Sequence, residues 1–153
     1  VDCFQTVLEA TGVALEPEDK DLPGVSLFEI AKGATPQRAI LSEQHSAGAK
    51  HGGFMIRLGR YKYVHYVNYA PLLYDLAKDP NELHDVAGDP AYAAALKDCE
   101  AALRGMLNPE EVDAKAKADQ KVRVEAGGGA AAIEAQGSLG YTPAPGETPV
   151  YVV

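Results

Sequence analysis

Alternating side-chain character over residues 53–66, "GFMIRLGRYKYVHY", limits the possible folds more than any other feature of this sequence. A period of two residues is typical of β-strands, and the glycine and arginine at 59 and 60 fit a two-residue hairpin turn. That turn pairs Leu58 with Tyr61, Ile56 with Tyr63 and Phe54 with His65, and it places all six side chains on one face. Because five of the six are apolar or aromatic, we predict that this face is the core and that the other face is half polar.

Further elements flank this hairpin. The segments "RAILSEQ" and "PLLYDL", residues 38–44 and 71–76, are predicted as additional strands. Asp89 can cap a helix that has Pro90 at its first position. That helix carries an apolar stripe at helical spacing: Tyr92, Ala95, Leu96, Cys99, Leu103, Met106 and Leu107. The fold class is therefore α+β, and Cys99 is expected to be a buried, inert thiol.

The chain begins directly with a helical pattern, "VDCFQTVLEATGV", which Gly12 can end. A natural protein rarely begins in the middle of a helix, so we expect an N-terminal part to be missing. A short helical turn is predicted over residues 27–33.

The C-terminal third contains a second predicted helix, over residues 109–125, with Asn108 and Pro109 as its cap signal. Its apolar face is thin, so it is either exposed or packed on a partner. Three glycines end it, and the proline-rich segment "YTPAPGETP" favours an extended path afterwards. Since spaced apolar residues continue to the end, we predict that residues 127–153 are an extended assembly tail. A frayed terminus is the alternative.

Composition excludes several classes of protein. The formal charge of -8, from 14 Lys and Arg against 22 Asp and Glu, argues against a nucleic-acid partner. No apolar run approaches the length of a membrane span, so no membrane partner is expected. The two cysteines form no C-x-x-C motif, and free thiols favour a reducing compartment, which indicates a cytoplasmic location.

Candidate site residues are few. His45 ends a predicted strand and enters the glycine-rich loop "SAGAKHGG", and loops of this kind often carry functional groups. His51 and His84 have weaker claims. Glu43 lies two residues before His45 and is the expected ion-pair partner of Arg57 and Lys62, which face each other across the hairpin; an anionic ligand there is the alternative.

Other polar and aromatic clusters have simpler interpretations. Tyr61 and Tyr63 are expected to pack in the core; stacking on nucleic acid is the alternative, which the net charge opposes. The acids between residues 75 and 89 do not match the calcium-loop pattern, so turns and helix caps explain them better. No metal site is predicted in this chain.

The order of several segments resembles the C-terminal part of sulfatases. These segments are "VDCFQTVLEATGV", "DLPGVSLFEIAKG", "SEQHSAG", "FMIRLGRYKYVHY", "LLYDLAKDPNELHDVAGDPAY" and "GYTPAPG". The likeness is to the choline-sulfatase-like and phosphonate monoester hydrolase-like branch of the alkaline phosphatase superfamily. It implies a four-stranded antiparallel sheet with a long helix packed on it, which closes one side of a cleft in the parent enzyme. It also implies a tail that reaches a neighbouring subunit, hence a homo-oligomer.

The resemblance also implies what lies elsewhere. The family carries a formylglycine within a Cys/Ser-x-Pro/Ala-x-Arg signature, and "CFQTV" and "CEAAL" do not fit it. No catalytic residue of the family maps onto this chain, so no cofactor is expected here, although the parent would bind calcium or manganese. Residues 1–126 would be the C-terminal subdomain, with 1–35 completing the larger catalytic domain, its missing partner. Glu43 and His45 are the substrate-proximal candidates, and the alternatives are a stand-alone interaction module or part of a phosphonate or phosphate ester hydrolase.

Overall fold

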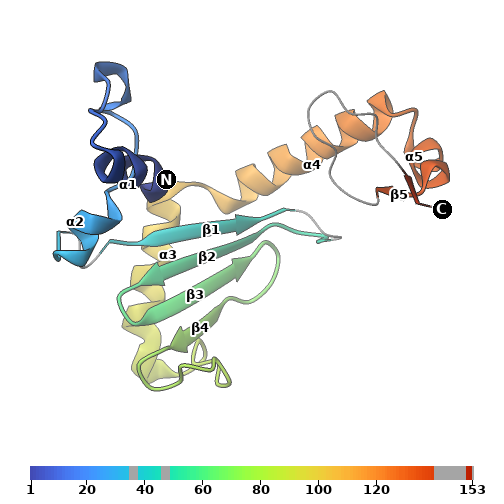
Figure 1. Ribbon diagram of the computed structural model, residues 1–153. Coiled ribbons are helices and arrows are strands. Elements are labelled where there is room, and N and C mark those ends of the chain that lie inside the picture. The colour runs from blue at the N-terminus through green and yellow to red at the C-terminus, as the bar shows by residue number, and fades with distance from the viewer. Residues whose placement is uncertain (35–37, 46–48, 140–150, 153) are drawn as a thin grey trace.

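A computed structural model describes residues 1–34, 38–45, 49–139 and 151–152. Its centre is an antiparallel sheet in the order β1-β2-β3-β4 (Figure 1). The strands are β1 (Ile40–Gln44), β2 (Gly53–Leu58), β3 (Tyr61–Tyr66) and β4 (Leu72–Asp75). One long helix lies against the sheet, so the predicted α+β fold is confirmed.

The hairpin of β2 and β3 has the predicted register. Leu58 pairs with Tyr61, Ile56 with Tyr63 and Phe54 with His65. Gly59 has a φ of 55°, which a two-residue turn of this kind requires and which glycine adopts without strain. Phe54, Ile56 and Tyr63 are almost completely buried, so the tyrosines on this face are packing residues.

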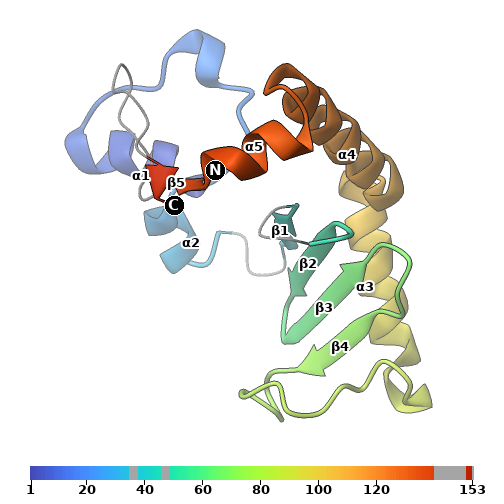
Figure 2. The ribbon, with the colours of Figure 1, turned by 90° about the vertical axis from the view of Figure 1, so that its right-hand side faces the viewer.

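Helix α3 (Ala93–Met106) covers the core face of the sheet, as Figure 2 shows. It is preceded by the 3-10 turn η2 (Pro90–Tyr92), for which Asp89 accepts a hydrogen bond from Ala91 N at 2.9 Å. Cys99 and Leu103 are buried against β2 and β3, as the apolar stripe predicts. Met106 is an exception at 49% exposure, because the last turn of α3 faces the N-terminal segment and not the sheet.

The acids of the loop after β4 act through backbone hydrogen bonds. Asp85 accepts from Leu73 N and Ala87 N, both at 2.9 Å, and Asp79 accepts from His84 N at 2.8 Å. These contacts confirm the prediction of turn and cap chemistry.

Helix α4 (Pro109–Ala126) leaves the end of α3 and runs away from the sheet (Figure 1). Asn108 caps it by accepting from Glu110 N and Glu111 N, as predicted. Only its first turns are buried, and Val122 is 64% exposed.

The glycines after α4 are followed by α5 (Ala130–Gln136) and by two short paired strands, β5 (Ser138–Leu139) and β6 (Tyr151–Val152). The prediction of an extended path is therefore wrong over Ala130–Gln136, where alanine-rich sequence favours a helix too short to show a periodic pattern. The whole of "YTPAPGETP" lies outside the described residues.

The N-terminal segment contains α1 (Asp2–Thr11), η1 (Pro17–Asp19) and α2 (Leu27–Ala31), with Gly12 ending α1 as predicted. Arg38, just before β1, binds the Asp2 carboxylate with both terminal nitrogens, and Val25 N donates to the same carboxylate at 3.0 Å. The Arg38 guanidinium holds the pKa of Asp2 well below its usual range. Within the described ranges, no helix combines the length and the apolar character needed to cross a membrane.

Candidate functional site

Glu43 and His45 lie together at the end of β1. The Nε2 atom of His45 is 3.2 Å from Oε2 of Glu43, and both side chains are partly exposed. Because a carboxylate only accepts hydrogen bonds, this contact places the imidazole proton on Nε2. The His45 Nδ1 atom is then an acceptor; it is buried and has no partner among the described residues.

Three contacts position His45, two on its ring and one on its backbone. It meets the Phe54 ring edge to face, with 5.3 Å between ring centres. A Cβ atom at Gly52 would lie 3.0 Å from both Cε1 and Nδ1 of His45, so a larger residue at this position would force the ring to shift. In addition, Gln120 of α4 donates to the His45 backbone carbonyl at 2.9 Å. The histidine is therefore fixed by the sheet, by a glycine and by α4.

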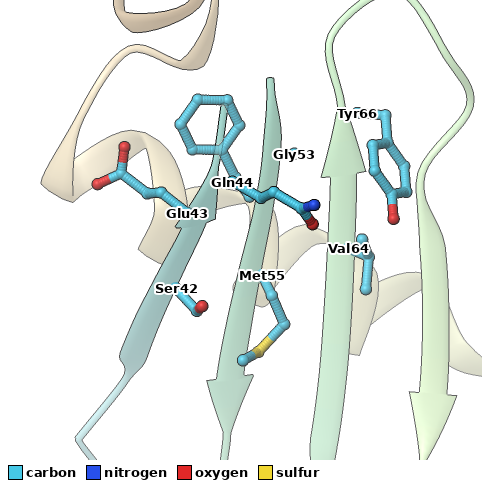
Figure 3. Close-up of a pocket in the computed structure, with 8 residues that line it drawn as sticks. Ser42, Glu43, Gln44, Gly53, Met55, Val64 and Tyr66 are labelled. Carbon is cyan, nitrogen blue, oxygen red and sulfur yellow. The ribbon is translucent and has the colours of Figure 1, made fainter. Parts of the chain in front are cut away.

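The opposite face of the sheet is hollowed at the same end. A cavity of about 100 Å³ is lined by residues of β1, β2 and β3. Figure 3 shows the Gln44 side chain reaching over β2 toward Tyr66, whereas the Glu43 carboxylate points away from it. A Cβ atom at Gly53 would lie 2.8 Å from the Tyr66 ring, so this second glycine makes room for an aromatic ring as Gly52 does on the core face.

The expected ion pair of Glu43 with Arg57 and Lys62 is not formed. Glu43 pairs with Phe54 across the sheet and so shares the core face, whereas Arg57 and Lys62 lie on the other face. Lys62 instead binds Glu82 at 2.5 Å, and Arg57 donates to the Gly59 carbonyl at 2.7 Å. The two cations are accommodated without an anionic ligand.

A buried carboxylate that the sequence reasoning missed joins α4 to the sheet. Asp113 is 6% exposed and accepts from Gly52 N at 2.7 Å and from Lys117 Nζ at 2.6 Å. The hydrogen bond from Lys117 lowers the pKa of Asp113. Lys117 Nζ also lies 3.2 Å from His51 Nδ1. The spacing of four residues between Asp113 and Lys117 is visible in the sequence, but the contact of Asp113 with Gly52 is not.

The other histidines differ in their surroundings. His84 is largely exposed beside Asp79, with 3.5 Å between Nδ1 and Oδ2. His65 is nearly buried, and its Nε2 lies 3.6 Å from Oε1 of Glu110. Arg104 binds Glu110 through two hydrogen bonds of 3.0 Å and lowers the pKa of Glu110 to about 2.

The residues present do not fit a sulfatase nucleophile or metal centre. Among the residues that the structure describes, no three His, Cys, Asp or Glu side chains form a group able to hold a metal ion. Cys99 is buried, and burial raises the pKa of its thiol to about 11, so the predicted inert thiol agrees with this environment. Cys3 is exposed, but the residues that follow it do not match the Cys/Ser-x-Pro/Ala-x-Arg signature.

Comparison with known proteins identifies this architecture. Residues 1–108 match the family described as N-sulphoglucosamine sulphohydrolase, C-terminal. The chain is 32% identical to Arylsulfatase K of Mus musculus over 126 residues, which are 74% of this chain and 22% of that protein.

Two solved structures agree in fold. A 2-O GAG sulfatase superposes with a TM-score of 0.54 at 30% identity, over 79% of this chain and 26% of that one. The phosphonate monoester hydrolase of Agrobacterium radiobacter gives a TM-score of 0.50 at 33% identity, over 68% and 23% of the two chains. The chain thus spans about a quarter of the length of these proteins. The chain therefore belongs to the family of C-terminal domains described as N-sulphoglucosamine sulphohydrolase, C-terminal, and through this family to the sulfatases of the alkaline phosphatase superfamily.

Proposed function

We propose that this chain works as the C-terminal subdomain of a sulfuric ester hydrolase and forms one wall of its active-site cleft. The observation that carries the proposal is the family match over residues 1–108, in a fold whose relatives are about four times as long. In this proposal, the nucleophile and the metal belong to the larger catalytic domain, which would carry formylglycine and calcium or manganese. The chain alone hydrolyses no sulfate ester.

Residues 1–35 complete the catalytic domain. Support comes from the N-terminal segment, which exposes large apolar side chains that a free surface segment would not need: Phe4, Val7, Val13, Leu22, Leu27 and Phe28 are each more than 40% exposed. A second body with a complementary apolar surface would cover them. Residues 127–153 contact a neighbouring subunit, in keeping with the projection of α4 away from the sheet.

Glu43 and His45 contact the part of the substrate that is not the sulfate group. A charged carboxylate repels a sulfate but accepts hydrogen bonds from hydroxyl or ammonium groups. Since His45 Nε2 donates to Glu43 and fixes its orientation, the pair offers acceptors at a defined place. A hydrogen bond to a charged group contributes about 1.5–3 kcal/mol, so losing it lowers kcat/KM roughly 10–150-fold.

The test uses the complete protein that contains this chain. Glu43→Gln and His45→Ala are compared with Lys97→Ala, a substitution at an exposed position of α3. We expect kcat/KM to fall for a sulfated sugar and to stay unchanged for 4-nitrophenyl sulfate, which lacks hydroxyl groups. Equal kcat/KM for all variants on the sulfated sugar contradicts the role of the pair but leaves the sulfatase assignment intact.

A second function is favoured by one observation. The likeness to a phosphonate monoester hydrolase at 33% identity makes phosphonate or phosphate esters the competing substrate class. Assay of the complete protein on 4-nitrophenyl sulfate and on a phenyl phosphonate ester decides between the two. A third alternative, a stand-alone interaction module, requires that neither ester is hydrolysed.

A further inference from the structure

A hollow beside the β3–β4 turn combines aromatic rings with cations. Its volume is about 260 Å³, which suits a single sugar ring, and its lining includes Lys50, His51, Tyr66 and Tyr69. The tyrosine side chains are 42% and 60% exposed, unusually open for aromatic residues next to a core. They lie on the segment "YVNY", in which Val67 is buried in the core and Tyr66 packs over Gly53.

The turn that carries these tyrosines is held rigidly. Val67 is buried, and its N–H donates to the Gly52 carbonyl at 3.1 Å. Tyr69 N donates to the Tyr66 carbonyl at 3.0 Å, and Asn68 between them has a φ of 70°. Asparagine tolerates this left-handed conformation better than most residues, so the turn is built for this shape. Two exposed rings are therefore presented in fixed positions.

The contacts of the His51 ring show which of its nitrogens is the donor. Its Nδ1 atom lies 3.2 Å from both Asn68 Nδ2 and Lys117 Nζ, and these two groups can only donate. Nδ1 must then be the acceptor, and Nε2 carries the proton. The ring also meets Tyr69 edge to face, with 5.6 Å between ring centres.

Lys50 lines this hollow and Lys117 contacts His51, in a chain that is acidic overall. Asp113 lies beside Lys117, but it is buried, is paired with the Lys117 ammonium group and accepts a hydrogen bond from Gly52 N. Lys50 lines the hollow and is exposed. Together with the His51 Nε2–H group, Lys50 provides two donors for one anionic group beside two aromatic faces.

We propose that this hollow binds an anionic sugar ring, whose apolar face stacks on Tyr69 and whose carboxylate or sulfate group contacts Lys50 and His51. Aromatic faces pack against the C–H groups of a ring, and the charged donors select rings that carry an anion. The small contact area limits the dissociation constant to roughly 1–10 mM. The site does not depend on the position of the active centre in the complete enzyme.

Titration of the ¹⁵N-labelled chain with four probes tests this site: glucuronate, N-acetylglucosamine 6-sulfate, glucose and sodium sulfate. We expect saturable shifts of the Gly52, Asn68 and Tyr69 amide signals with one or both anionic sugars. Whichever of the two binds more tightly tells a carboxylate site from a sulfate site. Glucose and sodium sulfate should bind at least about 5-fold more weakly, because each lacks one half of the recognised chemistry.

Substitutions separate the two halves of the site. Tyr69→Ala should weaken binding about 10-fold through lost stacking, and Lys50→Ala about 3-fold, with a larger effect at low salt. Lys97→Ala is the matched control, and unchanged amide dispersion shows that each variant is folded. The proposal is wrong if neither anionic sugar gives saturable shifts, if sodium sulfate binds as tightly as they do, or if folded Tyr69→Ala retains full affinity.

Discussion

Replacing Asp113 by alanine should destabilise the protein far more than its position near the start of an exposed helix indicates. The substitution leaves the buried Gly52 N–H without its acceptor at 2.7 Å, which costs about 1–3 kcal/mol. The ion pair with Lys117 adds little, because the lysine side chain is 43% exposed. We therefore expect the free energy of unfolding to fall by about 2 kcal/mol, or the melting temperature by roughly 4–8 °C.

Urea unfolding followed by circular dichroism measures this change, and amide hydrogen exchange localises it. Asp113→Asn keeps one acceptor and should lose about half as much, whereas Lys115→Ala, at an exposed position of α4, should stay within about 0.5 kcal/mol. The Asp113 pKa is lowered in the folded state, so its contribution is present above the unfolded pKa and is lost as the pH falls. A loss below about 0.5 kcal/mol for Asp113→Ala, with the Gly52 amide still protected, refutes the reasoning.

Three further outcomes follow from named contacts. Cys99 should react with a thiol reagent much more slowly than the exposed second thiol of the chain, since burial raises its pKa to about 11, and Cys99→Ser should cost roughly 1–3 kcal/mol in urea unfolding; rapid labelling in the folded state contradicts this. Arg104 lowers the pKa of Glu110 to about 2, so Glu110 stabilises the fold above its unfolded pKa and this stabilisation is lost as the pH drops toward 2. In Glu110→Gln, the free energy of unfolding should therefore fall less steeply as the pH is lowered. Gly52→Ala should displace the His45 ring, seen as a changed imidazole Cε1–H signal, and an unchanged signal argues against the tight packing of that ring on the glycine.

The fold was largely predictable because its main signals are local. The alternation over residues 53–66 and the Gly59 turn determine the hairpin register, since a slip by one residue would place the core side chains in water. The caps at Asp89 and Asn108 are also local: Asn108 caps α4 as predicted, whereas Asp89 caps the 3-10 turn η2, and α3 begins only after that turn, at Ala93. The buried stripe of α3 follows the same logic except at Met106, where the helix passes beyond the sheet.

The candidate site was less predictable because its contacts connect distant residues. Glu43 was expected to pair with Arg57 and Lys62 but lies on the opposite face, because the sequence before β2 does not reveal which alternate residues of β1 point to the core. The roles of Gly52 and of Asp113 depend on neighbours that are far away in the sequence, 61 positions apart in their shared hydrogen bond. No short-range pattern reports such contacts.

The most direct test of the central claim is the rate of ester hydrolysis by the complete protein that contains this chain. We expect the complete protein to hydrolyse 4-nitrophenyl sulfate in the presence of calcium or manganese, and the isolated chain not to exceed a boiled control. We also expect that removing residues 38–108 from the complete protein abolishes hydrolysis, because the sheet and α3 form a wall of the cleft. A complete, folded protein that hydrolyses neither sulfate nor phosphonate esters, or that keeps full activity without this subdomain, contradicts the account.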